Sequence, residues 1–128
     1  MIIADTDVLI DYLSGKEPGA GRVEAGLRDG TLHTTVISRF ELLSGAKSPK
    51  QIDKIKPLLD ALTIISLDAS AADRAAEIRR HLEQKGHGIG MADSLIAGMV
   101  MVHHGNLLTR NERHFNRVQA LKLSRWDS

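Results

Sequence analysis

Short apolar runs alternate along the chain with longer amphipathic stretches, a pattern that is typical of α/β proteins. The short runs predict strands, because they are apolar or rich in β-branched residues and are bounded by polar positions. They cover residues 2–4, 32–36, 63–67 and 107–109, with residues 121–123 as a candidate fifth strand at the sheet edge. The pattern predicts a three-layer α/β/α sandwich with a mainly parallel sheet of four or five strands.

Between these runs, apolar residues recur at the three- and four-residue spacing of helices that bury one face. The expected helices lie at residues 8–15, 23–29, 38–45, 52–62, 69–85 and 91–104, followed by a short helix that runs through residue 115. Ser38 and Glu41 have the spacing of a capping box, which makes Ser38 the expected N-cap. Pro57 is expected to kink or split its helix, and Gly105 is expected to end the helix before it.

Composition narrows the possible classes of protein. A chain of 128 residues fits one domain, which we expect to span residues 1–128. The absence of cysteine excludes disulfides, thiolate metal sites and cysteine nucleophiles, and a net charge of +1 neither requires nor excludes a polyanionic partner. The longest apolar run, residues 95–102, is too short for a bilayer span of ~20 residues. We therefore expect a cytoplasmic protein with no targeting segment and no membrane association.

Polar side chains with oxygen ligands stand at the places where parallel strands end. Asp5 follows the first predicted strand, and Glu41 lies on the helix after the second. Asp93 lies in the first turn of the helix before the fourth strand, which Asn111 follows. Sites in such sheets form beyond the carboxyl ends of the strands, so these groups are expected at one edge. Oxygen ligands without Cys suit Mg²⁺ or Mn²⁺, which offsets the repulsion between carboxylates and activates water at a phosphodiester.

Structural roles compete with this interpretation at each position. Asp5 is as well explained by capping a helix as by binding a metal, and Glu41 taken alone is better explained by the capping box. Asn111 also stands where it can cap the short helix after it. Asp93 is harder to explain structurally, because the helix that it opens is apolar on nearly all sides.

Four short motifs contain these polar residues. Residues 2–11 form an apolar strand followed by Asp-Thr-Asp and an apolar helix, and residues 35–45 end in Glu-Leu-Leu-Ser-Gly. Residues 93–97 are Asp-Ser-Leu-Ile-Ala, and residues 107–115 are a strand ending in Thr, followed by Arg-Asn and later by Phe. In this order they resemble the four motifs of the PIN-domain family, and within it the VapC and FitB-like bacterial toxins. The resemblance covers residues 2–126.

What the resemblance implies is a metal-dependent endoribonuclease, the toxin of a toxin–antitoxin pair. Asp5, Glu41 and Asp93 would be its catalytic acids and would bind Mg²⁺ or Mn²⁺. The implied reaction is an in-line attack on an RNA phosphodiester by metal-activated water, which leaves a 5′-phosphate and a 3′-hydroxyl.

The resemblance also assigns supporting residues. The hydroxyl groups of Thr6 and Thr109 would brace the site, and Asp7 would be a supporting acid at a position where the family often has Asn. Asn111 stands where many members of the family carry a fourth acid. Because an amide is a neutral ligand, the choice between one and two metal ions stays open.

Arginines near the proposed site are candidates for binding RNA. Arg110, Arg113 and Arg117 recur at helical spacing beside Asn111, which is equally compatible with a phosphate-binding patch and with a solvated helix face. Arg39 precedes Glu41 by two residues and is a further candidate, or a partner for the acids. The resemblance implies an RNA substrate, a small antitoxin that covers the acidic site, and a homodimer formed through the N-terminal half.

Three other functions were compared with this one. A catalytically silent PIN-fold binding module is opposed by the three intact acids. A Mg²⁺-dependent phosphatase of the Asp-x-Asp type, similar to the haloacid dehalogenases, is opposed by the short chain and by the lack of a strand-end lysine followed by paired aspartates. A signalling receiver domain needs a late lysine before proline, whereas Lys122 is followed by Leu123.

Overall fold

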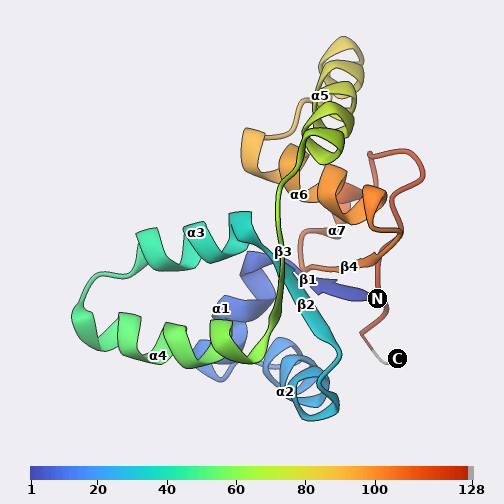
Figure 1. The fold of residues 1–128 in the computed structure, drawn as a ribbon. Coiled ribbons are helices and arrows are strands. Elements are labelled where there is room, and N and C mark those ends of the chain that lie inside the picture. The colour runs from blue at the N-terminus through green and yellow to red at the C-terminus, as the bar shows by residue number, and fades with distance from the viewer. Residues whose placement is uncertain (127–128) are drawn as a thin grey trace.

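A parallel sheet lies between two layers of helices in the structure, a computed structural model that describes residues 1–126 (Figure 1). Its strand order is β3-β2-β1-β4, and every neighbouring pair is parallel. The strands are β1 (Ile2–Ala4), β2 (Leu32–Thr35), β3 (Thr63–Ile65) and β4 (Asn106–Leu108). The predicted α/β/α sandwich is confirmed, with four strands. Residues 127 and 128 of the predicted domain lie outside the described residues.

Helices connect the strands and cover both faces of the sheet. They are α1 (Thr6–Ser14), α2 (Gly19–Asp29), α3 (Val36–Gly45), α4 (Pro49–Ala61), α5 (Ala69–Gln84), α6 (Met91–Val102) and α7 (Glu112–Phe115). Helices α1 to α4 contribute to a core on one face, while α5, α6 and α7 contribute to a core on the other. None of the helices in residues 1–126 is long and apolar enough to cross a membrane.

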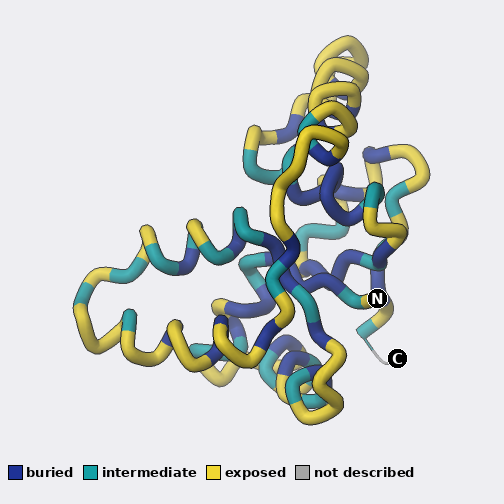
Figure 2. Tube along the Cα trace, in the orientation of Figure 1, coloured by how far each residue is buried: buried dark blue, intermediate teal, exposed yellow. Residues whose placement is uncertain are grey.

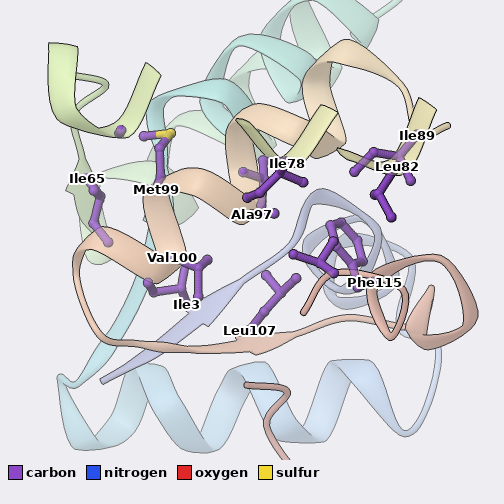
Figure 3. Close-up of a cluster of buried hydrophobic side chains, with 13 residues drawn as sticks. Ile3, Ile65, Ile78, Leu82, Ile89, Ala97, Met99, Val100, Leu107 and Phe115 are labelled. Carbon is purple, nitrogen blue, oxygen red and sulfur yellow. The ribbon is translucent and has the colours of Figure 1, made fainter. Parts of the chain in front are cut away.

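The two cores form because side chains alternate between the faces of a strand. In β1, Ile3 belongs to the core under α5, α6 and α7 (Figure 3), whereas Ala4 belongs to the core under α1 to α4. In β4, Leu107 and Leu108 divide between the same two cores. All four side chains are fully buried, in agreement with the dark central strands of Figure 2.

Helix α3 begins earlier than the sequence pattern predicted. Thr35 is its N-cap and accepts a hydrogen bond from the backbone N–H of Ser38 at 3.1 Å, so Ser38 lies inside the first turn. The prediction of Ser38 as the N-cap is wrong, because Thr35, the last residue of β2, already supplies the capping hydroxyl. Glu41 is therefore not the reciprocal member of a capping box, and its side chain is free for another contact.

Three further expectations changed in detail. Helix α4 runs unbroken through Pro57. The left-handed residue after α6 is His104 (φ 54°), not Gly105; a Cβ on Gly105 would lie 2.6 Å from Ile3 Cδ1, so close packing explains this glycine. The candidate fifth strand is reduced to a single parallel bridge between Leu107 and Leu123.

The crossing of α5 and α6 gives a stability prediction. A Cβ on Gly98 would lie 2.7 Å from the Ala71 carbonyl oxygen and 2.8 Å from the Ala75 nitrogen. Because both atoms are backbone atoms, Gly98→Ala must push the helices apart, and we expect it to lower the free energy of unfolding by about 1–3 kcal/mol. Urea denaturation measures the loss.

Gly45→Ala is the matched control, because Gly45 ends α3 and a Cβ there would have no neighbour within 4 Å. We expect this variant to be as stable as the wild type or slightly more stable. Equal stability of the two variants would contradict the close crossing of α5 and α6.

Candidate active site

Four carboxylates, here called the acidic cluster, meet at the carboxyl edge of the sheet: Asp5, Asp7, Glu41 and Asp93. Asp5 is the N-cap of α1, directly after β1, and Asp7 lies in the first turn of that helix. Glu41 lies on α3, and Asp93 lies in the first turn of α6. The charges of Asp7 and Asp93 act on Asp5, and the charge of Glu41 acts on Asp93. The three predicted acids and Asp7 thus lie within electrostatic range of one another.

Asp5 is the most deeply buried member of the acidic cluster, with 6% of its surface exposed. Its Oδ1 accepts a hydrogen bond from the Thr6 backbone at 2.8 Å, and its Oδ2 accepts one from Thr109 Oγ1 at 2.7 Å. Burial raises the pKa of the Asp5 carboxyl from 3.8 to about 7, and the negative charge of Asp7 adds to the rise. The two hydrogen bonds oppose this rise only in part.

Asp7 has one satisfied and one unsatisfied oxygen. Its Oδ2 accepts hydrogen bonds from the Arg110 backbone at 3.0 Å and from Thr109 Oγ1 at 3.3 Å, while its Oδ1 is buried without a hydrogen-bond partner. Burial raises the pKa of Asp7, although the N–H group and the charge of Arg110 act against it. Thr109 has one hydroxyl hydrogen for both Asp5 and Asp7, so the two carboxylates compete for it.

Thr6 links Glu41 to the start of α3. Its hydroxyl donates a hydrogen bond to Glu41 Oε1 at 2.7 Å and contacts Ser38 Oγ at 2.9 Å. Ser38 is fully buried. Ser38 was not among the predicted site residues, because its spacing from Glu41 suggested a capping role. The predicted bracing positions of Thr6 and Thr109 agree with these contacts.

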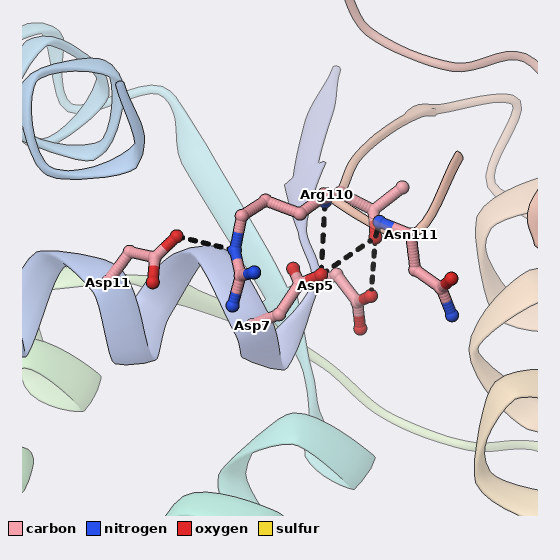
Figure 4. A network of polar contacts seen from close by, with 6 residues as sticks. Asp5, Asp7, Asp11, Arg110 and Asn111 are labelled. Atoms are coloured by element: carbon pink, nitrogen blue, oxygen red, sulfur yellow. Dashed lines mark hydrogen bonds and ion pairs between the residues drawn. The ribbon is translucent and has the colours of Figure 1, made fainter. Parts of the chain in front are cut away.

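The side chain of Arg110 points away from the acidic cluster, although the Arg110 backbone lies against the cluster. Its Nε pairs with Asp11 Oδ2 at 2.6 Å, and the Asp11 side chain is only 5% exposed (Figure 4). Asp11 was not among the predicted site residues, because no local pattern distinguishes it. The backbone N–H of Asn111 donates to Thr109 Oγ1 at 3.0 Å, so residues 109–111 form one hydrogen-bonded turn over the site.

The predicted row of arginines on one helix is wrong. Helix α7 spans only Glu112–Phe115, so Arg113 lies on it while Arg117 lies beyond its end. Arg117 instead lines a cavity against α5. Arg39 makes no ion pair with any residue in the described part of the chain, so its predicted pairing with the acids is also wrong.

Asn111 is the N-cap residue of α7, but its side chain contacts His114 and not the backbone of the helix. Its Nδ2 lies 3.1 Å from His114 Nδ1, and no side-chain capping bond forms at this N-terminus. Burial and the charge of Glu41 raise the pKa of Asp93, while His114 acts in the opposite direction. The imidazole therefore lies near enough to Asp93 to influence its charge.

The donor chemistry of the acidic cluster suits a hard divalent cation. All its ligand atoms are carboxylate oxygens, one of them buried and unsatisfied, and three of its four carboxyl groups have raised pKa values. Within residues 1–126, no three Asp, Glu or His side chains are arranged to share one ion as they lie. The side chains of the acidic cluster would therefore have to move to bring their oxygens around a cation.

The raised pKa of Asp5 predicts a specific pH dependence of stability. Between pH 4 and pH 7 the folded protein keeps a proton on Asp5 that the unfolded chain has lost, so stability falls as the pH rises. A rise in pKa from 3.8 to about 7 corresponds to a limit of about 4 kcal/mol. Urea denaturation in EDTA should therefore show Asp5→Asn gaining stability relative to the wild type across this range. Asp60→Asn, at an exposed position on α4, should show a constant difference; a constant difference for Asp5→Asn would contradict the prediction.

Comparisons with known proteins cover nearly the whole chain. The PIN domain profile matches residues 2–121. Ribonuclease VapC2 of Rickettsia felis is 31% identical over 129 residues, covering 96% of each chain. The tRNA(fMet)-specific endonuclease VapC of Shigella flexneri is 27% identical and covers 95% of each chain.

A solved structure agrees with these sequence matches. VapBC2 from Rickettsia felis, bound to a DNA fragment from their promoter, has a chain that matches with a TM-score of 0.86 at 28% identity, covering 99% of this chain and 100% of that chain. The sequence profile, the relatives and the shared fold agree over the same residues. The chain therefore belongs to the PIN-domain family, and the relatives that it matches are VapC ribonucleases.

Proposed function

We propose that this chain is a Mg²⁺- or Mn²⁺-dependent endoribonuclease that acts as the toxin of a toxin–antitoxin pair. The observation that carries the proposal is the acidic cluster, in which Asp5 is buried among other carboxylates and Asp7 Oδ1 has no partner. RNA as the substrate is supported by the relatives, which are a ribonuclease and a tRNA(fMet)-specific endonuclease.

In this proposal Asp5, Glu41 and Asp93 hold the cation, with Asp7 as a supporting acid. When bound there, the ion would activate a water and would offset the charge that develops on the phosphodiester. Asn111 would contribute at most a neutral ligand, because its side chain is an amide, and this amide already contacts His114. A second cation therefore has fewer charged ligands at this position than a fourth acid would provide.

The two threonines orient the carboxylates that hold the ion. Thr109 donates to Asp5 Oδ2 and Thr6 donates to Glu41 Oε1. Glu41 Oε2 would then be available for the ion, and Asp5 Oδ1 would offer it the lone pair that the Thr6 backbone N–H does not use. Asp5 must release its proton before it can act as a ligand, since metal and proton compete for the same oxygen. Water would lose a proton to solvent and add its oxygen to phosphorus, while the bond to the ribose 3′ oxygen breaks and that oxygen takes up a proton from solvent. The products are a 5′-phosphate and a 3′-hydroxyl.

We further propose a small antitoxin, a second copy of the chain and a cytoplasmic location. A cavity of about 350 Å³ beside Glu41 is lined mostly by apolar residues of α1, α3 and α4, which suits the apolar face of an antitoxin segment. A basic antitoxin side chain would reach the acidic cluster from there. Phe40 and Met91 are 68% and 65% exposed on the helices that carry Glu41 and Asp93, which supports a homodimer contact near the site.

The proposed chemistry predicts RNA cleavage that depends on a divalent cation. Purified chain, free of antitoxin, should cleave RNA from a cellular pool that includes tRNA when Mg²⁺ or Mn²⁺ is present, and EDTA should abolish cleavage. Asp5→Asn should slow cleavage more than about 100-fold, because losing a metal ligand costs several kcal/mol of transition-state stabilisation. Asp60→Asn should cleave like the wild type. Product ends carrying a cyclic phosphate, or cleavage that survives EDTA, would refute the mechanism.

Stabilisation by a divalent cation distinguishes the proposed nuclease from a catalytically silent binding module. Mg²⁺ or Mn²⁺ at 100 times its dissociation constant should stabilise the wild type by about 2.7 kcal/mol. The gain should grow as the pH rises towards 7, because Asp5 loses its competing proton. Thermal unfolding with and without metal measures it, with Asp5→Asn expected to lose the gain and Asp60→Asn to keep it. An unresponsive wild type would favour the silent module.

A further inference from the structure

We propose that a basic groove between α5 and residues 117–122 binds the phosphodiester backbone of single-stranded RNA, at a place separate from the acidic cluster. This inference rests on the proposed action on RNA. The groove consists of two adjoining cavities with volumes of about 470 Å³ and 310 Å³, which share the lining residues Arg74, Met101 and Ala120. Its basic side chains are Arg74, Arg80, His81, His104, Arg117 and Lys122.

The charges of this basic groove are strongly one-sided. Four side chains that are always positive at neutral pH face one acid, Glu77, whereas the whole chain has a net charge of only +1. Arg74, Arg80, Arg117 and Lys122 make no ion pair within residues 1–126. Its four cations outnumber the single carboxylate of Glu77, and an extended polyanion would relieve the repulsion that remains between them.

The cations come from two separate segments, so they can face a ligand from both sides. Arg74 and Arg80 lie on α5, whereas Arg117 and Lys122 lie on the loop after α7, which runs beside the α5 and α6 pair in Figure 1. A trough with positive walls is the form in which proteins follow the backbone of a single strand. Isolated surface cations along one helix would not form such a trough.

The backbone that shapes the basic groove is itself unusual. Ala120 has φ 68° and lines both cavities, and His104 has φ 54° and lines the smaller one. They are the two non-glycine residues with positive φ in the described part of the chain. The left-handed region costs a residue such as alanine about 1–2 kcal/mol. The turn at the wall of the groove is thus held by its surroundings against this local preference.

The chain runs from the acidic cluster through α7 to the basic groove, so the groove can hold a part of the RNA that lies beyond the cluster. Helix α7 connects Asn111, at the cluster, with Arg117, in the groove, and Arg113 is exposed on that helix between them. An RNA strand cut at the acidic cluster can therefore continue past α7 into the groove. Contacts with its phosphates there would add affinity without reading its sequence.

Binding without cleavage tests the proposal. A fluorescently labelled single-stranded RNA is titrated with the chain in EDTA, and anisotropy gives the dissociation constant at several salt concentrations. The double variant Arg74→Gln with Arg117→Gln should bind more weakly at low salt. Its plot of log affinity against log salt should become shallower by about 1.4, because each phosphate contact with a single strand contributes about 0.7.

Two matched controls separate groove contacts from other effects. Arg28→Gln with Arg79→Gln removes the same charge from exposed arginines outside the groove and should keep the wild-type slope. Arg74→Lys with Arg117→Lys keeps both charges and should restore the slope that the glutamine variant loses. Urea denaturation confirms that each variant is folded.

The outcomes distinguish this inference from the proposed nuclease function. An unchanged slope in the glutamine variant, or an equal loss in the lysine variant or in the outside control, would overturn the groove as an RNA site. Groove-dependent binding by a wild-type chain that cleaves no RNA would support the groove and refute the nuclease. RNA cleavage by the wild type, together with an unchanged slope in the glutamine variant, would support the nuclease and overturn the groove as an RNA site.

Discussion

The parallel pairing of β1 with β2 on one side and β4 on the other is the constraint on which the site depends. It brings the ends of three strands to one edge, so that Asp5, Thr35 and Thr109 follow Ala4, Thr34 and Leu108 in matching register. Antiparallel pairing of either neighbour would send its polar residues to the opposite edge. Because Ile3 and Ala4 each anchor a different hydrophobic core, the strand cannot slip by one residue without exchanging both cores.

This arrangement is unfavourable for the carboxylates themselves. Burial withdraws Asp5, Asp7 and Asp93 from water, and the pKa of each carboxyl rises as a result. The Thr109 hydroxyl offsets only part of that cost for Asp5 and Asp7, since it has a single hydrogen to donate. The edge of the sheet is therefore a place where protons, hydroxyl groups and any bound cation compete for the same few oxygens. Functional sites commonly concentrate such unfavourable electrostatics.

The sequence predicted the features that follow from periodicity and from local chemistry. The four strands, the helix starting after Asp5 and the placement of the acids at one edge all follow from alternating apolar runs in a parallel sheet. The sequence pattern did not predict the roles of residues that depend on contacts with other parts of the chain. Ser38 has good capping spacing, but Thr35 lies closer to the strand end and takes the role, and Asp11 gains its meaning only from Arg110, which is far away in the sequence.

The same limit applies to the arginines. A spacing of three and four residues predicts one helical face only if the helix is long enough, and α7 ends at Phe115. Arg117 therefore meets α5, a neighbour that no local pattern reveals. Gly105 gives a similar lesson, because its small size serves the packing of Ile3 and not the turn in which it lies.

The contacts of residues 109 and 110 have a consequence for synthesis on the ribosome. Thr109 and Arg110 supply hydrogen bonds to Asp5 and Asp7, and the Asp11 ion pair also comes from Arg110, across about a hundred residues of chain. Such distant contacts form late, since the chain is made from its N-terminus. A nascent chain that stops before β4 has its first acids but neither the strand nor the turn that fixes them. The acidic cluster therefore lacks these contacts until residues 106–110 have been translated.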